Sequence, residues 1–512
     1  MKRTPFFLLY IFASMLVGEV QAKIVLPAIF ANNMVLQQNE KVALWGWADA
    51  GEKVTIKPSW SKEITTVAAA DGKWTASLKT LKAGRAYTVK FSGKDNTFEL
   101  TNILFGEVWL CSGQSNMNFP LQKQGGWRTG VINYEQEVAA ANHPNIRFFT
   151  VEQKVADAPQ KDCKGSWEVC SPKTAVNFSA VAYYFAKDIQ QRLNVPVGII
   201  HSSWGGTPVE AWTKKEILES DEDFRPILER FKKQSENPKE ATDAYKLAVE
   251  QWKKDVADGK LTGIAKVQGP REALTKTSNK APSNLYNGMI APLVPFTIQG
   301  ALWYQGESNM DRAYQYRTLF PAMVDSWRKD WNTEFPFYFV QIAPHKGQHA
   351  EIREAQLLSF QSLKKAGMVV TTDVGDSADI HPRNKEAVGK RLALWALAKT
   401  YNKHLAYSGP LYKSIKVENG KALISFDFSE GLIAKNGNLK EFTIAGADQV
   451  FHPAKAEVKG NKVLVWSDEV SAPVAVRFGW KYVPHAELYN HAGLPASPFR
   501  TDSWKGETDN NR

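Results

Sequence analysis

Ser115, in the segment Gly113-Gln114-Ser115-Asn116-Met117, has surroundings that suit a catalytic nucleophile. The preceding residues 107–111 form an apolar run with the length of a buried strand, and Ser112-Gly113 is typical of a turn. A strand, a tight turn and a following helix would place the Ser115 hydroxyl at the carboxyl edge of a sheet, where open α/β folds bind ligands. The alternative is a serine that only caps the helix.

Two later segments carry groups that could stabilise the negative charge of an acyl-transfer intermediate. The strand 197–200 is followed by the Gly205-Gly206 turn, whose backbone N–H groups can approach an oxyanion with no side chain in the way. The strand 298–304 is followed by Gln305, whose amide could donate to the same oxyanion. Glu307 could hold this loop by accepting backbone N–H groups. Taken alone, each segment could equally be a turn or a polar loop.

His381 is the candidate general base. It follows the strand 368–372, lies in the loop Asp373 to Pro382 and precedes a helix. A carboxylate near such a His can hold one ring nitrogen while the other takes the serine proton. Asp379, two residues before His381, is our choice for this acid, Asp376 is its rival, and a Ser-His dyad is a third option.

Four segments in this order resemble the sialate O-acetylesterase family. They are GQSNM at 113–117, SWGGTPVEAW at 203–212, WYQGESN at 303–309 and DIHPRNKEAVGKRLA at 379–393. That family belongs to the SGNH-type hydrolases, so the resemblance implies a flavodoxin-like three-layer fold over about residues 103–400. It also implies a serine esterase that removes O-acetyl groups from sugars and requires no metal or organic cofactor.

The resemblance also assigns roles by position. Ser115 corresponds to the nucleophile and His381 to the base, and the implied oxyanion hole consists of the Ser115 N–H, the Gly205-Gly206 turn and Gln305. Met117 stands where the nucleophile elbow of an α/β-hydrolase would have Gly, so that other fold is disfavoured. The residues expected to contact the substrate are Gln114, Asn116, Trp204, Glu307 and Arg383.

The position of the acid departs from the pattern of many SGNH enzymes. Those enzymes place the Asp three residues before the His, a position that is Ala378 in this chain. The choice between Asp379 and Asp376 therefore stays open.

The motifs do not choose among acetylated sugars. A sialic acid carries a carboxylate, for which Arg383 or Arg128 would be a natural partner. Acetylated xylan has no such charge and would favour a longer groove lined by tryptophans, with Trp127, Trp204, Trp212 and Trp303 as candidates. A non-catalytic carbohydrate-binding protein that retains the fold is an alternative from another class, and it would bind sugar without releasing acetate.

Strands and helices alternate over residues 103–403, which predicts an α/β esterase domain with a mostly parallel sheet to position these groups. Apolar residues repeat at helical spacing over 180–193, and a second helix is predicted over 386–400. The charged segment 221–258 is also helical in pattern and carries no obvious chemistry. We expect it to be an inserted helical pair that can overhang a cleft.

β-rich segments flank this domain on both sides. Short strands separated by turns predict an immunoglobulin-like β-sandwich module over residues 23–102. A second β-rich module is predicted over 404–512, and its polar end from Lys505 is expected to fray. A chain of 512 residues is too long for one core, so several domains are expected.

The N-terminus predicts export. Lys2 and Arg3 precede an apolar run from Phe6 to Val17 that is too short to span a bilayer, and small residues follow. We interpret residues 1–22 as a signal peptide cleaved after Ala22, which places the mature protein in the periplasm or outside the cell. No other stretch is long and apolar enough for a transmembrane helix.

Charge and cysteines restrict the function further. The formal net charge is +11, but basic residues are interspersed with acidic ones and form no dense block, so a nucleic-acid partner is not expected. Of the three cysteines, Cys163 and Cys170 could bridge a loop in an oxidising compartment, whereas Cys111 is expected to be buried in a strand. Their spacing does not resemble a zinc site.

Overall fold

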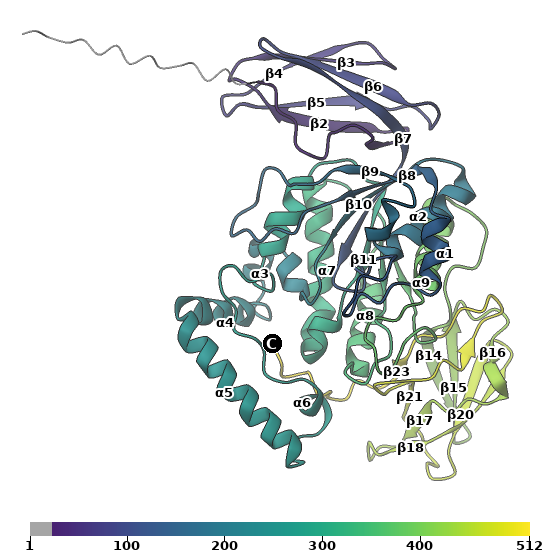
Figure 1. Ribbon diagram of the computed structural model, residues 1–512. Helices are drawn as coiled ribbons and strands as arrows, with labels where there is room; N and C mark the ends of the chain where they lie inside the picture. Colours follow the sequence, from purple (N-terminus) through teal and green to yellow (C-terminus); the bar gives the residue numbers. More distant parts are fainter. Residues whose placement is uncertain (1–22) are drawn as a thin grey trace, which may run out of the picture.

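The computed structural model describes residues 23–512, which form an N-terminal β-module, a central α/β domain and a C-terminal β-module (Figure 1). The predicted signal peptide, residues 1–22, lies outside the described residues. Within residues 23–512, no helix has the length and apolar character needed to cross a bilayer.

The N-terminal module contains two antiparallel sheets that pack against each other (Figure 1). One pairs β2 with β5, and the other pairs β3 with β4 and β6. Trp74 on β5 and Phe91 on β6 are both buried, and their ring centroids lie 6.2 Å apart between the sheets. The bounds are β2 Lys41–Trp47, β3 Lys53–Pro58, β4 Ile64–Val67, β5 Lys73–Lys79 and β6 Tyr87–Ser92.

The long strand β7 (Thr97–Gly113) joins this module to the central domain without a linker. Its first part pairs antiparallel with β6, and its second part pairs parallel with β10, β11 and the short strand β1 (Val35–Gln37). The domain boundary predicted between residues 102 and 103 therefore falls inside a strand. The strand that ends at the Ser115 turn is anchored in both parts of the protein.

The central sheet has the strand order β13-β12-β11-β7-β10-β8-β9. Neighbouring strands are parallel, except that β9 runs antiparallel to β8. All residues of β10, β11 and β12 are buried, as expected for parallel strands covered on both faces. This confirms the predicted α/β class. The bounds are β8 His143–Thr150, β9 Trp167–Cys170, β10 Val197–Ser203, β11 Gly300–Tyr304, β12 Phe337–Val340 and β13 Ala366–Val369.

Helices cover both faces of the central sheet. Adjacent side chains of β12 point to opposite faces, where Tyr338 packs against Trp395 of α9 and Phe339 packs against Phe320 of α7. Helix α2 packs beside α9, and α8 beside α7, so each face carries one helix pair. The bounds are α2 Ala180–Leu193, α7 Ala313–Asp330, α8 Ala350–Ser362 and α9 Lys385–Trp395. The prediction for α2 matches the observed bounds.

A helical insertion, residues 215–267, lies between β10 and β11 and projects from the domain (Figure 1). Its helices are α3 Lys215–Ser220, α4 Arg225–Glu236, α5 Pro238–Ala257 and α6 Gly263–Val267. The predicted helical pair at 221–258 corresponds to α4 and α5. Helix α4 buries only Ile227 and α5 buries no residue, so the insertion adds little to the core.

The C-terminal module consists of two four-stranded sheets and a two-stranded one, with the orders β14-β15-β20-β19, β18-β17-β21-β23 and β16-β22. It docks on the central domain through an ion pair of 2.6 Å between Arg500 on β23 and Glu354 on α8, both of which are buried. The bounds are β14 Leu411–Glu418, β15 Lys421–Asp427, β16 Ile433–Ala434, β17 Phe442–Ala445, β18 Phe451–Pro453, β19 Lys455–Lys459, β20 Lys462–Trp466, β21 Ala475–Phe478, β22 Leu488–Tyr489 and β23 Phe499–Arg500.

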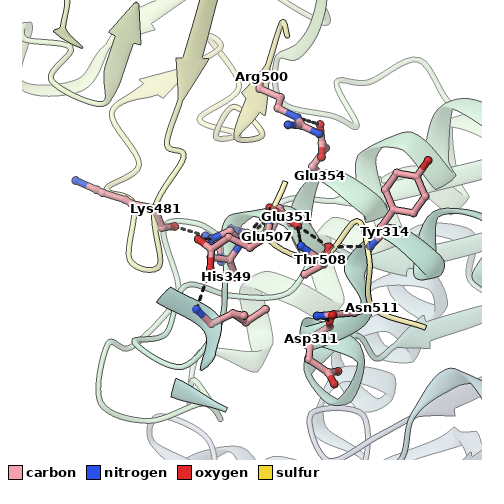
Figure 2. Close-up of polar contacts among 12 residues, drawn as sticks. Asp311, Tyr314, His349, Glu351, Glu354, Lys481, Arg500, Glu507, Thr508 and Asn511 are labelled. Carbon is pink, nitrogen blue, oxygen red and sulfur yellow. Dashed lines mark hydrogen bonds and ion pairs between the residues drawn. The ribbon is translucent and has the colours of Figure 1, made fainter. Parts of the chain in front are cut away.

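The C-terminal tail, residues 505–512, is bound to the central domain, and the expectation that it frays is wrong (Figure 2). Glu351 of α8 accepts hydrogen bonds from the backbone N–H groups of Glu507 at 2.7 Å and Thr508 at 3.1 Å. Asn511 donates to the backbone oxygen of Asp311 at 2.8 Å. The polar tail is ordered because buried polar groups of another element supply its hydrogen-bond partners.

All three cysteines are free and buried. Cys170 lies in β9, and its thiol contacts the backbone oxygen of Ala141 at 3.5 Å. The bridge that Cys163 and Cys170 could have formed is therefore not present in this structure.

Candidate active site

The loops that carry the predicted site residues leave the central sheet at the same edge. In the sheet register, Gly113 at the end of β7 lies beside Ser203 at the end of β10 and beside Tyr304 at the end of β11. The loops 114–118, 204–207 and 305–309 therefore start from neighbouring positions, as parallel strands require. Their side chains surround a cleft of about 510 Å³.

The structure brings Ser115 and His381 together. The Ser115 Oγ lies 2.9 Å from the His381 Nε2, across 266 positions of sequence. Ser115 is 9% exposed and lines the cleft, so its hydroxyl is held in place and still accessible. A hydroxyl within hydrogen-bond distance of an imidazole is the arrangement that lets the imidazole take its proton during nucleophilic attack.

The backbone around Ser115 differs from the expected strand-turn-helix. The N–H groups of Met117 and Asn118 both donate to the backbone oxygen of Gln114, which closes a single turn. No helix follows, because Pro120 has no N–H to continue the ladder and pairs instead in an isolated bridge with Ser179. Ser115 is therefore a turn residue and not a helix N-cap.

Asp379 is the acid next to His381, and its contact is loose. Its Oδ1 accepts the backbone N–H of His381 at 2.9 Å and lies 3.5 Å from the ring Nδ1. The rival, Asp376, uses its carboxylate to accept the N–H groups of Ala378 and Asp379, and so shapes the loop. The structure therefore favours Asp379 as the group that orients the imidazole.

The imidazole of His381 is partly buried and is held in its neutral form. Trp127 covers it, with ring centroids 4.7 Å apart. Burial, followed by the positive charge of Lys385, lowers the pKa of His381 to about 4, and Asp379 opposes this shift. A neutral imidazole at neutral pH can accept a proton, which is the requirement for a general base.

The backbone N–H groups of Ser115 and Gly205 have no acceptor among the described residues. Both residues line the cleft. A Cβ at Gly205 would lie 3.3 Å from the Ser115 Cβ, so only glycine brings its backbone this close without contact strain. The neighbouring Gly206 has φ +73° and lines the same cleft. This pair of N–H groups is suited to bind an oxyanion.

The structure contradicts the expectation that Gln305 donates to the oxyanion. Its side chain is fully buried, and its Nε2 donates to Asn309 Oδ1 at 2.6 Å and to the Thr207 backbone oxygen at 3.3 Å. Its Oε1 accepts the hydroxyl of Tyr316 at 3.0 Å. Gln305 therefore ties the loops after β10 and β11 to each other behind the cleft.

Asn116 joins the serine loop to the histidine loop. Its Nδ2 donates to Glu307 Oε1 at 2.7 Å and to the backbone oxygen of Ile380 at 3.0 Å, and its Oδ1 accepts from Lys385 Nζ. Asn116 follows Ser115 in sequence and Ile380 precedes His381, so this one amide fixes the two reacting groups relative to each other. The expectation that Asn116 contacts substrate is wrong, because both polar atoms of its side chain are hydrogen-bonded within the protein and the residue is 1% exposed.

Lys385 and Glu307 hold this amide from either side. Both are buried in this region, and burial lowers the pKa of Lys385 to about 7 while Glu307 and Asp379 oppose the shift. Burial likewise raises the pKa of Glu307, although its hydrogen bonds and Lys385 act against this. The Lys385 ammonium also lies 4.9 Å from the ring centroid of Phe119 and 5.3 Å from that of Tyr304.

Three of the five predicted substrate contacts line the cleft: Gln114, Trp204 and Glu307. Gln114 also accepts the N–H groups of Gly306 and Ser308, both at 3.3 Å. Arg383 does not line the cleft, because its guanidinium donates to the backbone oxygens of Gly130 at 2.9 Å and Val131 at 3.0 Å. Its expected role in binding substrate is wrong.

Of the four tryptophans that could form a sugar-binding groove, two line the cleft and two are buried in the core. Trp127 and Trp204 line the cleft, as does Arg128, which lies over the Trp127 ring at 5.1 Å. Trp212 and Trp303 have no exposed surface and pack edge to face in the core, with centroids 6.0 Å apart. The cleft therefore has two tryptophans and no extended aromatic floor.

Sequence reasoning missed Lys385 and several residues of the cleft wall. Lys385 is inside the motif at 379–393, but a lysine at the first residue of a helix is usually solvated, so its burial gives no signal in sequence. Asn118, Gln153, Ser308 and Ile380 complete the lining. They come from four different loops, which only the fold brings together.

Comparison with known proteins identifies the family of this chain. A family model described as carbohydrate esterase, sialic acid-specific acetylesterase matches residues 105–294 and 279–398. Sialate O-acetylesterase from Rattus norvegicus is 29% identical, over 91% of this chain and 92% of the relative, and that from Homo sapiens is 28% identical, over 94% and 93%. A carbohydrate acetylesterase from Xanthomonas citri has a solved structure with 35% identity and a TM-score of 0.79, covering 94% of this chain and all of the other. The chain belongs to the family of carbohydrate esterases described as sialic acid-specific acetylesterases.

Proposed function

We propose that this protein is a serine esterase of the SGNH type that removes O-acetyl groups from sialic acids. The observation that carries the proposal is the 2.9 Å contact between Ser115 Oγ and His381 Nε2, beside backbone N–H groups that have no acceptor among the described residues. This is the minimum set for acyl transfer: a nucleophile, a base and an oxyanion site.

The reaction proceeds in two acyl-transfer steps. His381 takes the proton of Ser115 as its oxygen attacks the acetyl carbonyl, and the N–H groups of Ser115 and Gly205 stabilise the oxyanion. The bond to the sugar oxygen then breaks, and His381 returns the proton to that oxygen. Water then attacks the acetyl-Ser115 ester while His381 takes its proton; the bond from Ser115 Oγ to the acetyl carbon breaks, His381 returns the proton to Oγ, and acetate leaves.

Asp379 and Asn116 act on this reaction through geometry. Asp379 holds the backbone and the Nδ1 side of His381, which keeps Nε2 directed at Ser115. Because Asp379 Oδ1 is 3.5 Å from Nδ1, it supplies a weaker bond than a buried triad carboxylate would. Asn116 holds the two loops at the distance that the proton transfer needs.

Sialic acid is favoured over xylan as the substrate by two observations. The relatives that match over most of the chain are named sialate O-acetylesterases. The long tryptophan groove expected for a neutral polysaccharide is not supported, since Trp212 and Trp303 are core residues. We further infer that residues 1–22 direct the protein to the periplasm or out of the cell, where glycans and not nucleic acids are its partners.

The test measures acetate release from a 9-O-acetylated sialoside and from acetylxylan. We expect the sialoside to be the better substrate, and Ser115→Ala to lower its kcat by about 10⁶-fold with the fold retained. A serine-directed fluorophosphonate should label the wild-type enzyme at Ser115. Undiminished turnover by Ser115→Ala would exclude the mechanism, and preference for acetylxylan would exclude the substrate. Sugar binding with neither acetate release nor labelling would instead indicate a non-catalytic binding protein.

A further inference from the structure

A second cavity, of about 410 Å³, adjoins the catalytic cleft. The two share Gly206 and Ser308 in their walls, so a molecule bound over these residues can extend from one into the other. The far wall comes from α4, from Tyr245 of α5 and from the segment 267–274. The helical insertion, which has little share in the core, thus builds a cavity next to Ser115.

All but one of the charged side chains that line the second cavity form ion pairs with each other. Glu210 lies 2.5 Å from Arg312, and Asp311 accepts from Arg271 Nε at 2.6 Å. Glu272 lies 2.5 Å from Lys280. No carboxylate side chain in residues 23–512 is within ion-pair distance of Arg230, the remaining cation of the lining. Among the described residues, Arg230 is therefore the one cation of this lining without a carboxylate side chain as its partner.

Arg230 is held so that much of its guanidinium is available. Its Nη1 donates at 2.8 Å to the oxygen of Arg512, the last residue of the sequence, which fixes the group against the C-terminal tail and leaves its other N–H groups for a ligand. Its Nε and Nη2 have no acceptor in the described part of the chain. Burial, and then the charges of Arg312 and Arg271, lower the pKa of Arg230 to about 10, so it stays charged at neutral pH. A planar cation with two free N–H faces matches a carboxylate.

We propose that Arg230 binds the carboxylate of an acidic O-acetylated sugar whose acetyl ester lies at Ser115. This inference rests on the proposed function and extends it. In a sialic acid, the carboxylate at C2 and an acetyl ester on the glycerol chain are separated by the ring oxygen and several carbons. The two groups must therefore occupy different places, and the second cavity lies next to the cleft. A neutral acetylated xylose has no carboxylate for Arg230 to bind.

The experiment compares two substrates that differ only in charge: the methyl glycoside of 9-O-acetyl sialic acid, and the same sugar with its carboxylate converted to a carboxamide. For the wild-type enzyme, kcat/KM should be about 10- to 100-fold higher for the acid, the range for one charge-assisted contact. Arg230→Gln should abolish most of this preference through KM, and Arg230→Lys should restore part of it, because lysine keeps the charge without the planar fork.

Three further measurements decide the outcome. Arg225→Gln is the matched control, since Arg225 lies on the same helix, is exposed and pairs with Glu222 at 3.5 Å, and it should keep the wild-type preference. Arg128→Gln tests the cation of the cleft itself, and loss of the preference there instead of at Arg230 would overturn the proposal. Equal efficiency of the wild-type enzyme on both sugars would also overturn it while leaving the esterase intact. Acetate release from neither sugar, with p-nitrophenyl acetate still hydrolysed, would reject the proposed substrate and with it the role of Arg230.

Discussion

The catalytic cleft and the second cavity beside it have walls that are built in opposite ways. On the wall formed by strand ends, Asn116, Gln305 and Asn309 are at most 1% exposed, and their amides hydrogen-bond to one another's loops. On the far wall of the second cavity, which the helical insertion helps to form, α5 buries no residue and most ion pairs are between exposed side chains. Ser115 and His381 are thus fixed by buried hydrogen bonds, whereas Arg230 and the rest of the far wall of the second cavity lie on a lightly packed element.

This difference has a functional consequence. Removing one partner of a buried hydrogen bond destabilises the folded protein, because the other partner stays buried without a bond. The strand-end side of the catalytic cleft therefore tolerates little change. The insertion can vary without loss of the core, because it makes few core contacts. Changes at the strand ends should therefore alter the hydrolysis of every acetyl ester, and changes in the insertion should alter only the choice of sugar.

The largest effect is expected from His381→Ala, which removes the base from the rigid wall. Without a proton acceptor 2.9 Å from the Ser115 hydroxyl, kcat should fall by about 10⁴-fold or more for p-nitrophenyl acetate and for acetylated sugars alike. Steady-state kinetics on both substrates measures this. His404→Ala, an exposed histidine away from the cleft, is the control. A variant that keeps a tenth of the activity would show that His381 is not the base.

Asn116→Ala should have the next largest effect, although Asn116 contacts no substrate. Loss of the amide frees the loop at Ile380 from the Ser115 turn, and a displacement of about 1 Å between reacting groups can lower the rate on the order of 10²-fold. The decrease should appear in kcat with KM little changed. Asn490→Ala is the matched control, because Asn490 is also a buried amide that bonds two backbone oxygens, Ser408 and Phe428, in the C-terminal module. Equal loss of kcat in both variants would mean that only stability is affected.

A smaller effect is expected from Lys385→Met, and it should appear in the pH profile. The pKa of His381 is lowered to about 4 by burial and by Lys385, so the base is neutral at neutral pH and activity falls as pH drops through the pKa. Lys385, with a pKa of about 7, is charged throughout that acidic range. Removing its charge should raise the pKa of His381 toward its ordinary value and move the acidic limb of kcat/KM to higher pH.

The control for this prediction is Lys390→Met. Lys390 lies on the same helix, but it is exposed and pairs with Glu386 at 2.7 Å, so its removal should leave the acidic limb in place. An acidic limb that stays fixed or moves to lower pH in Lys385→Met would contradict the assigned influence of Lys385 on the imidazole.

The sequence predicted correctly which loops meet at the edge of the central sheet, but it predicted the hydrogen-bond partners of the individual side chains less well. Strand ends followed by turns locate Ser115, Gly205 and His381, because parallel strands fix which loops are neighbours. The partner of a short polar side chain is decided by residues far away in sequence, and Gln305 faces Tyr316 of α7 instead of the cleft for this reason. The polar composition of the tail predicted fraying, but the tail is ordered. Its hydrogen-bond partners, such as Glu351, lie on other elements and cannot be recognised from the tail sequence.

The smallest effect is expected from Glu507→Ala in the tail, and it tests the far wall of the second cavity. Glu507 links the tail to two places: its Oε1 lies 3.0 Å from His349 Nε2, and its Oε2 accepts the backbone N–H of Ile264 in α6 at 2.9 Å (Figure 2). Removing these partly exposed bonds should lower the free energy of unfolding by only about 0.5–1.5 kcal/mol.

Kinetics of Glu507→Ala on a sugar ester and on a small ester should distinguish an effect on the second cavity from an effect on the catalytic cleft. Because α6 leads into the segment that walls the second cavity, a looser α6 should raise KM for an acetylated sialoside a few-fold while kcat for p-nitrophenyl acetate stays at the wild-type value. Glu507→Gln keeps an acceptor for the Ile264 N–H and should restore most of the sugar affinity. Glu507→Ala could instead lower kcat for p-nitrophenyl acetate as much as for the sialoside. The helical insertion would then be coupled to the Ser115–His381 pair, and the proposed difference between a fixed catalytic cleft and an adaptable second cavity would be wrong.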